Sequence, residues 1–197
     1  MGVLGHWLLR LGNNVSMDNR YVALLRGVNI GGRRPVPRAE FASVLTDFGA
    51  SEVSIYINSG NAVFTHDDAP TSAAVQQALE KHFPFDVQTL VLPARQIADI
   101  AAAIPSDWRN DPATAEKVGH KSDVLYLFPE VDRPSIVTEL RYRPEFEEMV
   151  YLPGAVITRV TRAQQSRSAL NKLAASPLYS QVTVRNVNTA RALAGLI

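Results

Sequence analysis

Apolar residues fall into short blocks that predict alternating strands and helices from Tyr21 to the C-terminus. Continuous apolar runs are typical of buried strands, and apolar residues three and four positions apart are typical of amphipathic helices. In the first half of the chain, this pattern predicts strands at 21–25, 53–57, 62–65 and 87–92. It predicts helices over 41–48, 75–82 and 97–104, the last of which stops at Pro105.

The same order of elements returns in the second half. The pattern predicts strands at 123–128, 147–152, 155–160 and 181–184, and helices at 134–140, 168–175 and 190–197. Each half therefore has the order β-α-β-β-α-β with a trailing helix, which is the ferredoxin-like arrangement. We predict an α+β protein with two ferredoxin-like halves, 20–104 and 120–197. The non-periodic residues 105–119, rich in Pro, Asp and Ala, are predicted to link them.

Residues 1–19 do not fit either half. Their short apolar patch is interrupted by His6 and Arg10, and it lacks the features of a signal peptide. We expect a disordered N-terminal extension here, with Met17 a plausible alternative start.

Composition narrows the chemistry that this chain can perform. It is 46% hydrophobic, which is enough to form a core, and it has no cysteine. The lack of cysteine excludes thiolate catalysis, iron–sulfur clusters and the usual structural zinc sites, and it fits a cytoplasmic location. The four histidines are scattered, and no nucleotide-binding fingerprint is present. We therefore expect no metal and no cofactor, and, since no apolar segment is long enough to span a bilayer, no membrane partner.

The net charge of +1 conceals an uneven distribution. All nineteen acidic residues lie at or before Glu148, whereas residues 149–197 carry six cations and no acid. The overall balance therefore does not exclude an anionic partner.

A loop at 26–38 combines three glycines with four arginines and contains no acid. Glycine lets backbone amides approach an anion, and arginine suits phosphate or carboxylate. The alternative is a flexible, solvated loop. The candidate ligand-binding residues of this loop are Arg26, Gly27, Asn29, Gly31, Gly32 and Arg33.

Two further segments contain candidate residues. The turn at 58–61 is a hairpin signal rather than a nucleophile site, because no histidine lies near Ser59 in the sequence, but its polar side chains can border a groove. At 183–189, Asn186, Asn188 or Thr189 can cap the last helix, and Arg185 with that helix N-terminus can form a second anion site. The candidates from these two segments are Asn58, Ser59, Asn61, Arg185, Asn186 and Asn188.

Three stretches resemble the signatures of a bacterial family of unknown function, DUF1697. They are YVALLRGVNIGG at 21–32, YINSGN at 56–61 and RNVNT at 185–189. The resemblance implies a compact build with ferredoxin-like halves, and it implies no particular activity, substrate or cofactor. This chain has Val187 where tryptophan is usual and Arg38 where methionine is common.

Three hypotheses follow. The first is a non-catalytic protein that binds an anionic ligand, either nucleic acid or a phosphorylated metabolite, through the basic loop and the last helix. The second is a small enzyme acting on a phosphate- or carboxylate-bearing substrate in a cleft between the halves. On that hypothesis these seven residues converge on one cleft: Arg26, Asn29, Asn58, Ser59, Asn61, Arg185 and Asn186. The third is an assembly role for exposed sheet edges.

Overall fold

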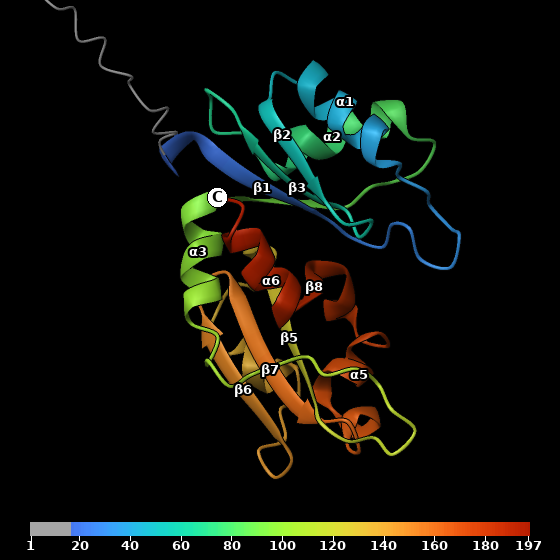
Figure 1. The fold of residues 1–197 in the computed structure, drawn as a ribbon, viewed down its shortest axis with the longest axis vertical. Helices are drawn as coiled ribbons and strands as arrows, with labels where there is room; N and C mark the ends of the chain where they lie inside the picture. The colour runs from blue at the N-terminus through green and yellow to red at the C-terminus, as the bar shows by residue number, and fades with distance from the viewer. Residues whose placement is uncertain (1–16) are drawn as a thin grey trace, which may run out of the picture.

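The computed structural model describes residues 17–197, which form an α+β protein with two four-stranded antiparallel sheets and six α-helices (Figure 1). Of the expected N-terminal extension, residues 1–16 lie outside the described part. Met17–Asn19 form a short 3-10 helix, η1.

In the first half, two helices cover one face of the sheet. The strands lie in the order β2-β3-β1-β4, and all neighbouring pairs are antiparallel. Every residue of β3 is buried, because the sheet is covered on both faces. The elements are β1 (Arg20–Leu25), α1 (Arg38–Asp47), β2 (Ser51–Tyr56), β3 (Asn61–Thr65), α2 (Ser72–His82) and β4 (Thr89–Pro93).

The second half repeats this strand order as β6-β7-β5-β8. Its helices α4 and α5 are shorter than predicted, and 3-10 turns that begin with Pro129 and Pro177 lie beside them. The elements are β5 (His120–Leu127), η2 (Pro129–Val131), α4 (Ile136–Glu139), β6 (Glu147–Leu152), β7 (Ala155–Thr161), η3 (Gln165–Arg167), α5 (Ala169–Leu173), η4 (Pro177–Gln181) and β8 (Val182–Asn186).

The trailing helices, α3 (Ala94–Ala102) and α6 (Val187–Ala194), pack together where the two halves meet (Figure 1). One hydrophobic cluster includes Leu24 of the first sheet, Tyr126 of the second, and Ile97 and Leu193 of the helices. Trp108, from the segment 105–119, is also buried in this cluster. The two halves therefore share one core.

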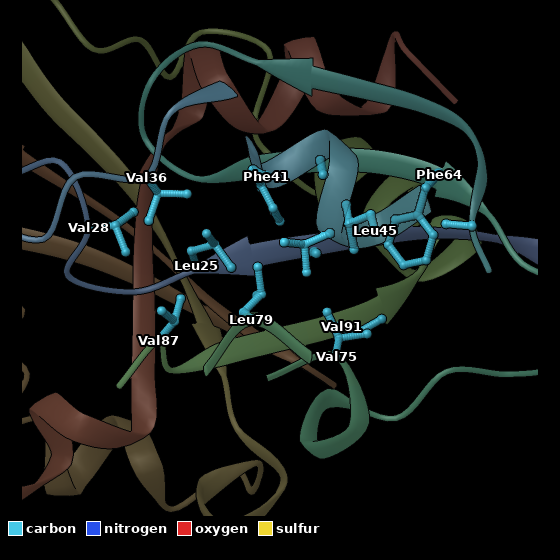
Figure 2. Close-up of a cluster of buried hydrophobic side chains, with 14 of the residues drawn as sticks. Leu25, Val28, Val36, Phe41, Leu45, Phe64, Val75, Leu79, Val87 and Val91 are labelled. Atoms are coloured by element: carbon cyan, nitrogen blue, oxygen red, sulfur yellow. The ribbon is translucent and has the colours of Figure 1, made fainter. Parts of the chain in front are cut away.

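The basic loop is anchored rather than freely solvated. Val28 and Val36 are both buried and lie at one end of the first half's core, beside Leu25 and Phe41 (Figure 2). Arg38 donates to the carbonyl of Ile55 at 2.7 Å. Packing thus fixes the loop at both ends, and its glycine-rich tip between them is exposed.

The turn between β2 and β3 depends on glycine at position 60. Gly60 has a φ of +72°, and a Cβ there would lie 2.6 Å from the Cβ of Leu25. In Gly60→Ala, this clash adds to the strain of the left-handed backbone, so we expect a loss of about 3 kcal/mol in the free energy of unfolding. Gly31→Ala is the matched control, because Gly31 also has a positive φ but no atom lies within 4 Å of its Cβ position. Its expected loss is about 1 kcal/mol.

Urea denaturation of both variants measures these losses. Equal losses for the two substitutions would contradict the close approach at Gly60.

Candidate functional site

The guanidinium of Arg185 joins the two halves. Arg185 lies on β8, and its Nε donates to Oδ1 of Asn61 at 2.6 Å. Its Nη2 donates to the carbonyls of Leu25 at 2.7 Å, Ser59 at 3.0 Å and Gly60 at 3.2 Å. Nη1 bonds within the second half, to Thr183 Oγ1 and the carbonyl of Val184. One side chain therefore donates to backbone carbonyls at the end of β1 and in the turn after β2.

All of these acceptors are neutral. Within residues 17–197, Arg185 forms no ion pair. Burial lowers the pKa of Arg185 to about 10, which leaves the guanidinium charged at neutral pH. The junction of the halves thus contains a buried positive charge with no carboxylate beside it.

Asn29 holds the same turn from the other side. Its Nδ2 donates to the carbonyl of Asn58 at 2.7 Å, and its Oδ1 accepts from the amide of Val36 at 2.8 Å. Asn61 also holds the turn, because its Nδ2 donates to Ser59 Oγ at 2.8 Å. The segments 21–32, 56–61 and 185–189 therefore meet at one hydrogen-bond network.

A pocket of about 250 Å³ opens beside this network, between the two halves. Arg26 lies in its wall, where Nη1 donates to Gln88 Oε1 at 2.6 Å and Nε donates to the carbonyl of Tyr179 at 2.9 Å. The Arg26 guanidinium also lies over the Tyr179 ring, 4.3 Å from its centroid. The pocket is lined by Leu25, Arg26, Gly27, Val28, Ile30, Ser59, Tyr179, Val182, Thr183, Val184 and Arg185. We call it the junction pocket.

The structure divides the predicted site residues between two pockets. Arg26, Gly27, Ser59 and Arg185 line the junction pocket, and Asn61 adjoins it through Arg185. A second pocket of about 590 Å³ lies along the basic loop and is lined by Asn29, Gly32, Arg33, Pro35, Val36, Pro37, Arg38, Ala39 and Asn58. Gly31 is at the exposed loop tip.

At the predicted second anion site, Arg185 and the N-terminus of the last helix both have partners within the protein. Asn186 caps α6 by accepting from the amide of Thr189 at 2.9 Å, so one amide of the helix N-terminus is already paired. Asn188 is turned toward the carbonyl of Asn110. Arg185 lies instead in the same pocket as Arg26. The seven residues named for a common cleft are therefore brought together only in part, with Arg26, Ser59 and Arg185 at the junction pocket and Asn29 and Asn58 at the second pocket.

Two cations of the acid-free C-terminal run are engaged within the protein. Arg159 pairs with Glu148 at 2.7 Å and Asp107 at 2.8 Å, and Arg191 donates to the carbonyls of Trp108 and Pro105. These partners lie earlier in the chain, so no local sequence pattern indicates them.

Sequence reasoning missed Tyr179, which lies on η4. The one available signal was Ser176-Pro177, because Ser176 caps this turn by accepting from the amide of Leu178. Among residues 17–197, no group of three or more histidines and carboxylates could hold a metal ion. No helix in that range has the length and apolarity needed to cross a membrane.

Comparison with known proteins gives a family and a likeness to solved structures. A family model described as "Protein of unknown function (DUF1697)" matches residues 18–157. The solved structure of a conserved bacterial protein from Streptococcus pneumoniae is similar, with 27% sequence identity and a TM-score of 0.70. This likeness covers 90% of this chain and 97% of that chain, so it includes both halves. No curated protein matches.

Arg185→Met tests the network. This substitution removes the charged donor from Asn61 Oδ1 and from the carbonyls of Leu25 and Ser59, and it leaves the Gly60 carbonyl with only the amide of Leu25. We expect a loss of about 3 kcal/mol or more in the free energy of unfolding. Arg191→Met, which removes bonds to two carbonyls, is the comparison, with an expected loss of about 1–2 kcal/mol. Thermal and urea unfolding measure both, and a smaller loss at Arg185 than at Arg191 would refute its role as the link between the halves.

Proposed function

Because this chain belongs to the DUF1697 family, which is described as being of unknown function, we propose a function from the geometry of the junction pocket. The pocket binds a small anionic ligand that carries a phosphate or carboxylate group. The observation that carries this proposal is the buried Arg185 charge, which has only neutral acceptors and lies in the same pocket wall as Arg26.

Several donors in the pocket are available to an anion. Nη2 of Arg26 makes no hydrogen bond within residues 17–197, and neither do the backbone amides of Gly27 and Val28. Gly27 has a φ of +69°, and left-handed turns of this kind form concave arrays of amides that bind anions. The side chain of Arg34 approaches Gly27 and adds a third guanidinium beside the pocket. No acidic residue is among the lining residues, so a ligand supplies the missing negative charge.

The geometry favours a small molecule over nucleic acid. Proteins that read single-stranded RNA on a sheet expose aromatic residues on one open face of that sheet. Here, helices or the other sheet cover both faces of each sheet. A pocket of about 250 Å³ suits one phosphate or carboxylate head group rather than a strand.

The geometry also favours binding over catalysis. The residues lining the junction pocket include no aspartate, glutamate, histidine or lysine, so none of them can act as a general base at neutral pH. The hydroxyl of Ser59 accepts from the side-chain Nδ2 of Asn61, so it has no basic partner that could activate it.

We also infer that each half is a ferredoxin-like domain, with boundaries at 20–104 and 120–197 and the linker at 105–119. The support is the β-α-β-β-α-β order together with the strand order found in both sheets. On this assignment, the ligand lies at the contact between two domains, which is a common position for small-molecule sites.

Binding can be tested with simple anions. Native mass spectrometry of the purified protein detects a ligand that is already bound, and calorimetric titration at low salt uses inorganic phosphate, pyrophosphate and malonate as probes. We expect at least one probe to bind, and Arg26→Gln to weaken it about tenfold or more, because the substitution removes a charged donor. Arg26→Lys retains the charge but not the planar donor group, so we expect it to weaken binding less than Arg26→Gln does.

Arg95→Gln is the matched control, because Arg95 is exposed on α3 and the substitution changes the net charge equally. The Arg95→Gln variant should bind the probes with the same affinity as the unmodified protein. Circular dichroism confirms that Arg26→Gln is folded under the titration conditions. Equal affinity for the two glutamine variants, or no binding of any probe, would contradict the proposal. Tight, steeply salt-dependent binding of a single-stranded oligonucleotide that is unaffected by Arg26→Gln would favour nucleic acid instead.

A further inference from the structure

We propose, resting on the function proposed above, that the ligand of the junction pocket is an anion joined to a flat apolar body, as in a nucleoside monophosphate or an aryl phosphate. Ile30 and Tyr179 bind that body, while Arg26 and the adjacent amides bind the anion. This assigns Ile30 and Tyr179 as the residues that determine specificity.

The first support is the exposure of two large apolar side chains at one pocket. Ile30 is 63% exposed and Tyr179 is 42% exposed, and both line the junction pocket. Most large apolar side chains among residues 17–197 are buried in the three hydrophobic clusters. Apolar groups left exposed beside a polar pocket are typical of ligand contacts.

The second support is that backbone hydrogen bonds fix the chain at both residues. The amide of Arg33 donates to the carbonyl of Ile30, and the amide of Asn29 donates to the carbonyl of Arg34. These bonds close a tight turn through Gly31 and Gly32, which have positive φ. Ile30 is not buried in this turn, so packing does not account for an apolar residue there. Contact with a ligand in the junction pocket would account for it.

Tyr179 is fixed in a different way. Its amide donates to the carbonyl of Ser176 at 3.0 Å, and its own carbonyl accepts from Arg26. The Arg26 guanidinium lies over its ring, so the anion-binding cation and the aromatic surface form one unit. A ligand whose anion binds Arg26 thus has its neighbouring atoms beside the tyrosine ring.

The size of the pocket fits this division. About 250 Å³ accommodates the anionic head group, and a larger body then extends over the exposed rim. Ile30 comes from the first half and Tyr179 from the second, so the body contacts both halves.

A series of phosphates tests the assignment by calorimetry. The probes are inorganic phosphate, glycerol 3-phosphate, phenyl phosphate and adenosine and cytidine monophosphate. We expect the aromatic members to bind about tenfold or more tightly than inorganic phosphate, because stacking on an aromatic side chain adds to the anion contact. Glycerol 3-phosphate, which has a polar body, should bind about as weakly as inorganic phosphate.

Two variants locate the effect. Ile30→Ser and Tyr179→Leu should each remove most of the affinity advantage that the aromatic probes have over inorganic phosphate, measured on the same variant. Ile57→Ser is the matched control for Ile30→Ser, because Ile57 is 43% exposed but does not line the junction pocket. It should leave the whole series unchanged.

The outcomes separate this inference from the proposed function. Binding of inorganic phosphate with no preference for aromatic members would overturn the inference and leave anion binding intact. A preference that survives in both Ile30→Ser and Tyr179→Leu would also overturn it. If no member of the series binds, both proposals fail.

Discussion

The arrangement of the two halves depends on one guanidinium. Arg185 donates to Asn61 and to three carbonyls of the first half, and it also bonds within its own strand. For one side chain to reach these acceptors, the turn after β2 must fold against the end of β1. Gly60 permits that approach, because any Cβ there would overlap Leu25. The glycine, the asparagine and the arginine are thus parts of one geometric requirement.

The common core reinforces the same junction. Helices α3 and α6 pack against each other and against both sheets, and they bury Leu24 and Tyr126 in one cluster. Separating the halves would expose this apolar surface and also break the bonds from Arg185 to the first half, which makes separation costly. The shape of the junction pocket is therefore set by the fold, and a ligand of the proposed kind would lose little binding free energy to ordering the site.

Local patterns predicted the strands well and the tertiary contacts poorly. The predicted strand 147–152 coincides with β6, because strand periodicity is a property of neighbouring residues. The turn η4 has no repeating apolar pattern, so Tyr179 was missed. Arg185 and Asn61 lie 124 positions apart, and no local rule pairs them. The pairing of Arg159 with Asp107 could not be predicted for the same reason, because Asp107 lies 52 positions earlier, in the segment 105–119.

The choice of asparagine at position 61 connects stability with binding. A carboxylate there would neutralise Arg185 within the protein, but it could not donate, as Nδ2 of Asn61 does, to the carbonyl of Tyr56 and to Ser59. The side-chain amide of Asn61 donates within the turn and accepts from the guanidinium of Arg185. Because this amide is neutral, it leaves the charge of Arg185 without a counter-ion. A buried charge without a counter-ion reduces stability, and the fold keeps this one beside a pocket that contains a second arginine. An anion in that pocket would regain the electrostatic energy that the neutral network does not supply. On the proposed function, the residue that joins the halves would therefore also provide the field that attracts the ligand.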